Sequence, residues 1–447
     1  MRTISGLLCI LALTFGAVAG FAADKEVRIL KSTTKGKPIP PGSIKFLGPD
    51  NHSLASYKAQ NHLSAATNQL IKNTALKAPA FHNGTALNTI PYFQNWFITG
   101  TRNSVYPYSM VGQSPPAGGT TGINNQIIPL VTVLQEGGVT LYTFDPTIAN
   151  DPQGTDISLT TQSPLYDATT KYPGPPADTG QFLDTSMRAE FNSVRKADWH
   201  TLLNPPSSSG IVWIQQLEYH NGDWACVSGE APPCTSFPVV NINTISNNFG
   251  FILAVENPPN STVPIIETDY VTAFVPGGGC CVLGYHSTQP GTNPPGANSV
   301  LVWTWASFIP QSNNPFAPFG DDVMVLSHEL SELYNDPFVA TGGTAVSPWV
   351  DGSVSFAQAN LETGDVIEGM AAADVVYPVP LAPNGQAYTY TIQNVALLAW
   401  FTRNPLDGGL YSWPNEHTLS QCPHVQSSTP SWCYGEGSAG FFFGPPY

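Results

Sequence analysis

The segment VLSHELSELYNDP, which ends at Pro337, contains three groups suited to metal chemistry within five positions. His328 and Glu332 are four residues apart, so on an α-helix their side chains lie one above the other on the same face. An imidazole and a carboxylate one turn apart form a ligand pair that a helix presents to a divalent ion. Glu329 lies beside them, where its carboxylate would accept a proton from a water molecule. The segment therefore predicts a metal site with a general base.

Glu332 stands where the zinc-binding pattern His-Glu-x-x-His has its second histidine. One neutral imidazole and two carboxylates would cancel the charge of Zn²⁺, so this site would acidify a water less than a two-histidine site does. Carboxylate ligands also shift the preference towards harder ions. We therefore expect Zn²⁺ as the cofactor, with Mn²⁺ or Ca²⁺ as alternatives. The competing interpretation is a surface helix whose acidic side chains are simply solvated.

A helix over about residues 321–335 is needed to position these side chains. Asp321 and Asp322 are expected to cap its start, where carboxylates also favour the positive end of the helix dipole. Pro337 ends it, because proline disfavours a helical conformation in the residue before it. The spacing predicts one apolar face, made of Val323, Leu326, Leu330 and Leu333.

A third ligand is expected from beyond the helix, where SPWVDGSVSFAQANLETGDVIEG supplies several carboxylates. Glu362 is the first choice, because it stands 30 residues past Glu332 in the turn-like sequence ETGD. Pro337 would place Asp336 at a fraying helix end, and a histidine that follows a strand is more often a packed residue than a ligand. The alternatives, as further ligands or supporting residues, are Asp365, Asp336, Asp351 and His286.

The segment from Leu326 to Asp365 resembles a group of secreted bacterial proteins with a His-Glu-x-Ala-Glu helix, then Asp-Pro, then Glu-Ile-Gly-Asp. VLSHELSELYNDPFV, WVD and ETGD carry this resemblance, with Ser331 in place of alanine and Thr363 in place of isoleucine. HELSELYNDP is more distantly similar to the Exordium-like (phosphate-induced) extracellular proteins of plants. Members are regarded as zincin-like. The resemblance therefore implies a zincin-like site made of His328, Glu329, Glu332, Glu362 and Asp365, and it implies no substrate.

Outside this segment the chain is rich in strand-like runs and turn residues. The 42 prolines and 40 glycines favour many loops and few long helices. Strands are predicted in IIPLVTVLQ, VTLYTF, IVWIQQLEY, FGFILAVE, YVTAFVP and SVLVWTWASFI. Further helices are predicted over roughly 185–203 and 393–403, and in SLASYKAQNHLSAATNQLIKN near the N-terminus. The pattern predicts an α+β, β-rich protein with a zincin-like metal-binding helix packed on a mixed sheet.

Residues 1–23 have the features of a secretory signal peptide, namely Arg2, an apolar run, and small residues before a cleavage point. The apolar run is too short for a stable membrane span. We therefore expect a protein that is secreted to the extracellular space or the periplasm and that has no membrane span. An uncleaved N-terminal anchor is the alternative.

Charge divides the rest of the chain near residue 90. Residues 24–90 carry nine Lys or Arg and three acidic residues, whereas residues 91–447 carry six Lys or Arg and 28 acidic residues. The first part is expected to be a polar, basic N-terminal extension, or a pro-segment that docks on an acidic, β-rich body containing the metal site. The acidic body disfavours nucleic acid and anionic membranes as partners and favours cations.

Six cysteines remain after the signal peptide, and an even number in an exported chain favours disulfides. Short loops are the easiest to close, so Cys226 is expected to pair with Cys234, and Cys422 with Cys433. The neighbours Cys280 and Cys281 are left for a vicinal bridge.

Two functions fit these observations. The first is a metal-dependent hydrolase, most simply a peptidase with an extracellular peptide or protein substrate. In it Glu329 is the general base, and the metal ligands are His328, Glu332 and Glu362. The second is a non-enzymatic extracellular binding or adhesion protein in which Ca²⁺ or Zn²⁺ is structural. The base favours the enzyme, and the carboxylate-rich ligand set favours the binding protein.

Overall fold

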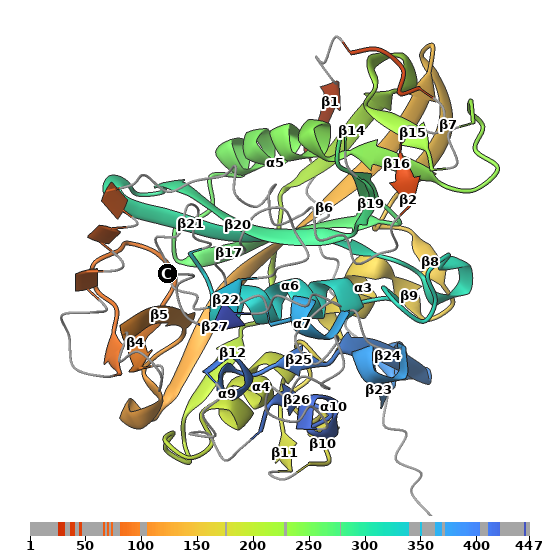
Figure 1. Ribbon diagram of the computed structural model, residues 1–447. Coiled ribbons are helices and arrows are strands. Elements are labelled where there is room, and N and C mark those ends of the chain that lie inside the picture. Colours follow the sequence, from red (N-terminus) through yellow and green to blue (C-terminus); the bar gives the residue numbers. More distant parts are fainter. Residues whose placement is uncertain are drawn as a thin grey trace, which may run out of the picture.

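A mixed β-sheet with a helix on each face forms the centre of the structure (Figure 1). The computed structural model describes residues 26–31, 36–40, 44–46, 66–67, 69–70, 73–74, 81–98, 105–174, 177–227, 230–277, 279–338, 349–350, 363–368, 372–402, 410–420 and 442–443. These ranges include the whole helix that carries the candidate metal ligands and the strands against which it packs.

Within the described ranges, the main sheet has nine strands: β1 (Glu26–Lys31), β6 (Thr120–Glu136), β7 (Val139–Phe144), β12 (His200–Leu203), β13 (Ser207–Ser208), β14 (Ile211–Glu218), β17 (Thr262–Asp269), β20 (Gly284–Thr292) and β21 (Pro295–Phe308). The order is β1-β14-β6-β17-β21-β20, and β7, β12 and β13 also pair with β6. Neighbours from β1 to β21 are parallel, whereas β20 is antiparallel to β21. The sheet is therefore mixed, as the sequence predicts.

Strand β21 separates two apolar cores, because successive side chains of a strand point to opposite faces of the sheet. Alternate residues belong to different clusters: Val300, Val302 and Ala306 to one, and Leu301, Trp303 and Trp305 to the other. A strand buried on both faces has a nearly continuous apolar sequence, and SVLVWTWASF shows this pattern.

The two faces of the sheet are covered by α5 (Ile242–Glu256) and α6 (Met324–Asn335), which lie on opposite sides of β20 and β21 in Figure 1. Phe249 of α5 packs against three rings of the sheet, with centroid distances of 6.1 Å to Tyr285, 6.1 Å to Trp303 and 5.5 Å to Trp305. Helix α6 packs against β20 and β21 from the other side. The apolar face expected of α6 is buried, with Leu330 and Leu333 both at 0% exposure.

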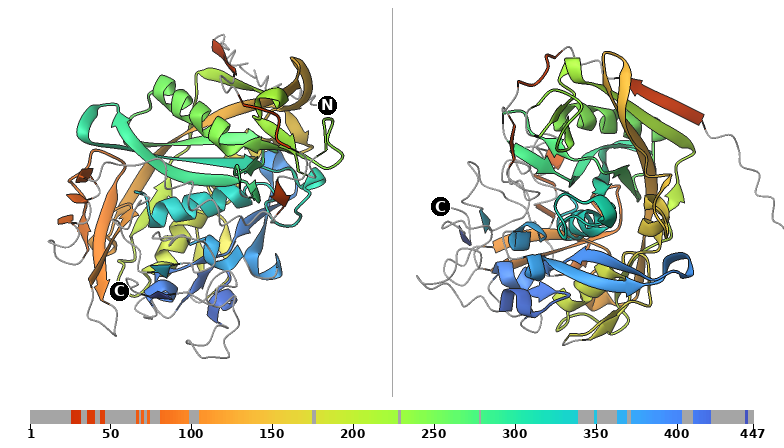
Figure 2. Two further views of the ribbon diagram at one scale, coloured as in Figure 1. Left: turned by 45° about the horizontal axis from the view of Figure 1, so that its top comes forward. Right: turned by 90° about the vertical axis from the view of Figure 1, so that its right-hand side faces the viewer.

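Smaller sheets surround this centre (Figure 2). One contains β2 (Lys45–Phe46), β15 (Trp224–Cys226), β16 (Pro238–Asn241), β18 (Ala273–Phe274) and β19 (Gly279–Val282), and another contains β3 (His82–Asn83), β4 (Tyr92–Ile98) and β5 (Val105–Val111). The two-stranded pairs are β8 (Ala149–Asp151) with β9 (Gly154–Thr155), β10 (Lys171–Tyr172) with β11 (Asp178–Thr179), β22 (Trp349–Val350) with β27 (Phe442–Phe443), β23 (Val376–Leu381) with β24 (Tyr388–Gln393), and β25 (Val395–Ala396) with β26 (Ser412–Trp413).

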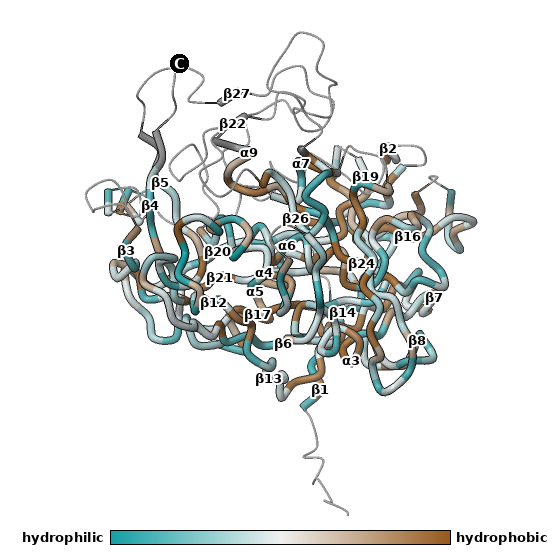
Figure 3. The backbone as a smooth tube through the Cα atoms, turned by 90° about the horizontal axis from the view of Figure 1, so that it is seen from below, coloured by the Kyte–Doolittle hydropathy of each residue, from teal (hydrophilic) through white to brown (hydrophobic). Residues whose placement is uncertain are grey.

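The other helices of the described ranges are short. They include α3 (Asp156–Thr161), α4 (Phe182–Glu190), α7 (Asp365–Glu368), α8 (Ala372–Val375), α9 (Leu398–Thr402) and α10 (His417–Ser420), with 3-10 turns η1 (Pro115–Ala117), η2 (Tyr219–Asn221), η3 (Gln311–Asn313) and η4 (Pro383–Gly385). Residues 66–67, 69–70 and 73–74 of the expected N-terminal helix are also helical. Hydrophobic segments gather among the inner elements, and hydrophilic ones run mainly along the periphery (Figure 3). In the part of the chain that the structure describes, no helix combines the length and the apolar character needed to cross a bilayer.

The prediction of a strand in FGFILAVE is wrong, because residues 249–256 form the second half of α5. Asn241 caps this helix, and its side chain accepts a hydrogen bond from the backbone N–H of Asn243. Ile245, Phe249 and Ile252 then fall on one buried face. The branched and aromatic residues resemble a strand over eight positions, whereas the helical period is visible only over the full 15 residues of the helix.

Two predicted helices are shorter in the structure. The one expected over 185–203 ends at Glu190, because the Asp184 carboxylate binds Nδ1 of His200 (2.8 Å) and the backbone N–H of Thr201 (2.7 Å). These bonds draw residues 200–203 alongside α4 as strand β12. The helix expected over 393–403 is confined to α9, since Gln393 ends β24 and Ala396 lies in β25.

The start of α6 also differs from the prediction, because the helix begins at Met324 and no side chain caps it. Asp322 has φ of 42°, and its carboxylate accepts the backbone N–H of Thr391 at 3.0 Å and the Gln311 amide at 2.7 Å. This aspartate therefore joins the start of α6 to β24 instead of capping the helix.

Part of the basic N-terminal segment adds to the main sheet. Strand β1 lies at the edge and pairs in parallel with β14, and the Arg28 guanidinium lies 5.8 Å from the ring centroid of Trp213. Strand β2 pairs with β19, and β3 pairs with β4. The expected signal peptide lies outside the described residues, and the division at residue 90 stays a prediction.

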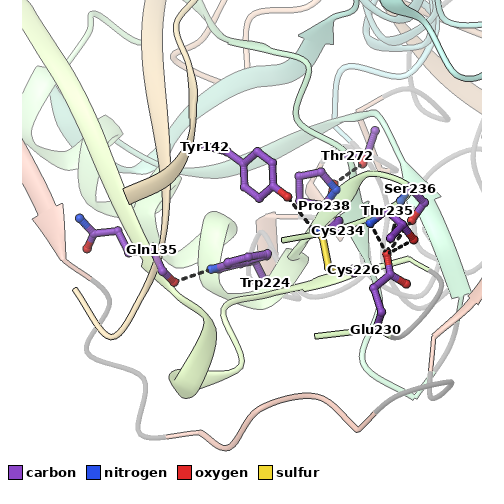
Figure 4. Close-up of a disulfide and its surroundings, with 10 residues drawn as sticks. All are labelled: Gln135, Tyr142, Trp224, Cys226, Glu230, Cys234, Thr235, Ser236, Pro238 and Thr272. Atoms are coloured by element: carbon purple, nitrogen blue, oxygen red, sulfur yellow. Dashed lines mark hydrogen bonds between the residues drawn. A yellow bond between two sulfur atoms is a disulfide. The ribbon is translucent and has the colours of Figure 1, made fainter. Parts of the chain in front are cut away.

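The predicted disulfide between Cys226 and Cys234 is confirmed (Figure 4). The Tyr142 hydroxyl accepts a hydrogen bond from the backbone N–H of Cys234 at 2.7 Å, and the Trp224 indole donates to the Gln135 carbonyl at 3.0 Å. Cys280 and Cys281 are joined as a vicinal disulfide. Cys422 and Cys433 lie outside the described residues.

Gly284 controls how closely α6 approaches the sheet. A Cβ atom there would lie 2.7 Å from Cγ1 of Val325 and 2.9 Å from both Cγ of Glu329 and the Trp305 carbonyl oxygen. We expect Gly284→Ala to destabilise the protein by about 1–3 kcal/mol through overpacking. Gly250→Ala, at an open position in α5, should instead stabilise by about 0.5–1 kcal/mol because glycine disfavours helix. Denaturant unfolding measures both, and equal changes in the two variants would contradict this packing account.

Candidate metal centre

Helix α6 is buried along its whole length, including the polar residues predicted to bind a metal. The exposed fractions are 6% for His328, 2% for Glu329 and 0% for Glu332. The alternative of a solvated surface helix is therefore wrong. Carboxylates so deep in a protein need cationic or hydrogen-bonding partners, because an ionised group loses its hydration there.

The imidazole of His328 is oriented by Gln393, the last residue of β24. The Gln393 amide nitrogen donates to the Gly364 carbonyl at 2.7 Å, which identifies the other amide atom as the oxygen. That oxygen lies 2.9 Å from Nδ1 of His328, so Nδ1 carries the hydrogen and donates it. Nε2 of His328 is then the atom that faces the carboxylates. A histidine ligand held through its second nitrogen is the usual arrangement at metal sites.

The turn before α7 brings Asp365 to the same place. The Ala396 N–H donates to the Thr363 carbonyl at 2.8 Å, which ties the turn to β25. A Cβ atom at Gly364 would collide with the His328 imidazole, so the absence of a side chain lets the turn lie against the ring. Oδ1 of Asp365 reaches 3.4 Å from Nε2 of His328, while Oε1 of Glu332 lies 3.1 Å from the same nitrogen.

These separations fit a bound cation. Two ligand atoms at about 2.1 Å from an ion, at a tetrahedral angle, lie about 3.4 Å apart. Ligand atoms of His328, Glu332 and Asp365 all lie within 4.8 Å of one another. Since Nδ1 carries the hydrogen, a neutral His328 would point the Nε2 lone pair at two negative oxygens. That arrangement is repulsive unless a proton or a metal ion lies between the atoms.

His286 of β20 lies on the opposite side of Glu332. The alternation along β20 directs Tyr285 towards α5 and His286 towards α6, where His286 is fully buried. Its Nδ1 lies 3.5 Å from Oε2 of Glu329 and 3.5 Å from Oε2 of Glu332. These three residues form a second group whose ligand atoms lie within 4.8 Å of one another. His286 is thus placed at the site, although its sequence context favours an ordinary packed histidine.

The other candidates have different positions. Asp336 follows α6, its N–H donates to the Glu332 carbonyl at 2.6 Å, and it belongs to neither of the two histidine-containing groups formed by described residues. Asp351 and Glu362 lie outside the described residues, so the choice of Glu362 as third ligand stays a prediction. Cys226, Glu230 and Cys234 also cluster, but the two sulfur atoms are bonded to each other and no longer offer thiolates. No sequence pattern points to Gln393, because an amide 65 residues from His328 belongs to no metal-binding motif.

The site is deepest at His286 and shallowest at Asp365. The side chains of His286 and Glu332 are at 0% exposure, those of Glu329 and His328 at 3% and 7%, and that of Asp365 at 25%. Among the described residues, solvent therefore reaches the site from the side of Asp365.

A second group of buried carboxyl groups lies where β17 meets α3, with Glu267 on the same face of the sheet as Ile265 and α6. Burial raises the pKa of Glu267 to about 8, despite a 2.9 Å hydrogen bond from the Thr160 hydroxyl. Burial, and then the charges of Asp269 and Glu267, raise the pKa of Asp156 to about 10. No histidine joins these residues in the metal-compatible groups of the described chain, so this cluster retains protons instead.

Comparisons with known protein families, curated proteins and solved structures find no match for this chain. The resemblance to zincin-like secreted proteins therefore stays a prediction. The class defined by the structure alone is a β-rich α+β protein with a largely buried histidine–carboxylate cluster between α6, β20 and the start of α7.

Replacing Gln393 tests the orientation of His328. Gln393→Leu should lower the affinity for a divalent ion by about 10- to 100-fold, because the ring loses the acceptor that fixes its tautomer. Gln386→Leu, at an exposed position beyond η4, is the matched control and should leave the affinity unchanged. Calorimetric titration with Zn²⁺ measures both, and an unchanged affinity in Gln393→Leu would show that this hydrogen bond does not position a ligand.

The carboxyl cluster of β17 predicts a pH dependence of stability. Between the ordinary glutamate pKa of 4.5 and the folded value of about 8, the unfolded chain loses the Glu267 proton and the folded protein keeps it. Each pH unit in this window therefore lowers the free energy of unfolding by up to about 1.4 kcal/mol. Glu267→Gln should flatten this slope, as measured by urea unfolding at pH 5 to 8. A uniform offset with an unchanged slope would contradict the assignment.

Proposed function

We propose that this protein is a metal-dependent hydrolase with a zincin-like site, acting on peptide bonds of extracellular substrates. The observation that carries the proposal is the convergence of His328, Glu332 and Asp365 on one point, with His328 held in the ligand tautomer by Gln393. A general base beside the ligands, on the same helix, supports hydrolysis over simple ion binding.

The residues divide into ligands and a base. His328, Glu332 and Asp365 would hold the ion, with Glu362 as a further candidate from the sequence. A bound divalent ion supplies Lewis acidity, which polarises a substrate carbonyl and makes a water a better nucleophile. Oε1 of Glu329, 3.9 Å from Nε2 of His328, lies where it would accept the proton of the attacking water. Burial of Glu329 keeps bulk water from competing for its carboxylate.

Zn²⁺ is the first choice of ion, and Mn²⁺ is the main alternative. Two carboxylates and one imidazole make a harder ligand set than two imidazoles and one carboxylate, so Mn²⁺ competes better here than at a His-Glu-x-x-His site. The acidic composition of the chain, with a formal net charge of −15, also favours cations near its surface.

The second candidate is an extracellular binding protein in which the ion is structural. The depth of the site favours this structural role, because Glu332 and His286 are fully buried and structural ions are usually enclosed. In either case the Cys226–Cys234 disulfide is compatible with an extracellular location.

Removing a ligand tests the ion. His328→Ala should lose the ion that His328 holds and lower the melting temperature of the metal-loaded protein, because the ion stabilises only the folded state. The exposed His220→Ala is the matched control and should keep both the metal and the melting temperature. Elemental analysis and thermal unfolding are the measurements, and equal metal content in wild type and His328→Ala would reject this ligand.

Replacing the base separates the two candidate functions. Glu329→Gln preserves the shape of the side chain and should abolish cleavage of a peptide library while the ion bound by His328, Glu332 and Asp365 remains. Full activity in this variant would exclude Glu329 as the base. Absence of cleavage by metal-loaded wild type would favour the structural role.

A further inference from the structure

Glu332 faces two histidines with two different oxygens. Its Oε1 lies 3.1 Å from Nε2 of His328, and its Oε2 lies 3.5 Å from Nδ1 of His286. The histidines come from different elements, α6 and β20, and belong to different groups of ligand atoms. A carboxylate that directs one oxygen to each of two ligand sets has the geometry of a bridge between two ions.

The His286 group has the composition of a metal site of its own. His286, Glu329 and Glu332 supply one imidazole and two carboxylates, and their ligand atoms lie within 4.8 Å of one another. All three side chains are buried, with exposed fractions of 0% for His286, 3% for Glu329 and 0% for Glu332. Oε2 of Glu329 accepts no hydrogen bond within the described part of the chain, and it points to Nδ1 of His286 at 3.5 Å. An ionised oxygen so placed needs a cation.

We propose that this cluster binds two divalent cations, one held by His328, Glu332 and Asp365 and the other by His286, Glu329 and Glu332, with Glu332 as the bridge. The proposal rests on the metal-binding function put forward above and adds a second ion to it. Carboxylate-bridged pairs of ions in hydrolases lie about 3.5–4 Å apart, a span that the two oxygens of one carboxylate cover.

The charges of the cluster favour two ions over one. Glu329, Glu332 and Asp365 bring three negative charges when ionised, and the two histidines are neutral as ligands. One divalent ion leaves the cluster with a formal charge of −1, which would hold a water proton tightly. Two ions leave it at +1, which lowers the pKa of a water at the site. A glutamate in place of the second histidine makes a single ion less effective at lowering the pKa of a water. The second ion offsets this loss.

In the two-ion arrangement the two carboxylate oxygens of Glu329 have different roles, one as a metal ligand and one as a proton acceptor. Oε2 faces His286 and would bind the second ion, whereas Oε1 faces His328 at 3.9 Å and remains available to a water proton. Glu329→Gln should therefore weaken the second ion as well as hydrolysis, while the first ion stays.

The test is a metal count on the full mature chain. The protein is freed of metal by dialysis against a chelator and titrated with Mn²⁺ alone, with bound ions counted by elemental analysis after desalting. Two equivalents per chain are expected. The paramagnetic resonance spectrum of the fully loaded wild type should show two exchange-coupled ions instead of the six lines of isolated Mn²⁺. This measurement needs no variant, so it does not depend on how a mutant folds.

Variants then assign each ion. His286→Ala and His328→Ala should each keep one equivalent with an isolated-ion spectrum, Glu332→Ala should keep none, and His220→Ala should keep two. A single equivalent in wild type that persists in His286→Ala and disappears in His328→Ala would overturn the second ion and leave the proposed function intact. A single equivalent lost in both histidine variants would also overturn the pair, since one ion would then bind both rings. No bound metal in wild type would overturn both proposals.

Discussion

Two carboxylates held side by side in the interior are the constraint on which the surrounding structure depends. Glu329 and Glu332 lie on a helix that is buried on every side, and an ionised carboxylate in such a place costs several kcal/mol unless it is compensated. Among the residues that the structure describes, both carboxylates lie within 4 Å of two histidines, one from α6 itself and one from β20. The sheet therefore supplies an imidazole to this cluster as well as supporting the helix.

The presence of histidine distinguishes two clusters of buried carboxyl groups in the described part of the chain, one around Glu267 and one around Glu332. Both lie on the α6 side of the main sheet. Glu267 has a hydroxyl as its hydrogen-bond partner, and burial raises its pKa so that it keeps its proton near neutral pH. Glu332 faces two imidazoles, whose lone pairs bind cations. The same burial thus accompanies a protonated cluster in one place and a histidine–carboxylate cluster with metal-compatible geometry in the other.

The sequence predicts the parts of this site that are local. His328, Glu329 and Glu332 are recognisable because helical spacing places them together without any knowledge of the fold. Asp365 is suggested by its turn, but its contact with His328 depends on hydrogen bonds from Gln393 and Ala396. His286 and Gln393 come from strands 42 residues before and 65 residues after His328, and strand pairing across such distances is not encoded in a local pattern. The error at α5 has the opposite cause, since its local pattern favours a strand and the tertiary core favours a helix.

The pairing of β20 with β21 has a consequence for folding fidelity. The two strands form a hairpin in which Tyr285 lies opposite Trp305 and His286 opposite Thr304. A slip by one residue would exchange the two faces of β20, because side chains alternate. Tyr285 would leave the aromatic core of α5 for the carboxylates of α6, and an imidazole would enter the space beside Phe249. Misregistered chains would then lack both a filled core and a complete histidine–carboxylate cluster, so any metal ion bound at that cluster would report that this hairpin has closed correctly.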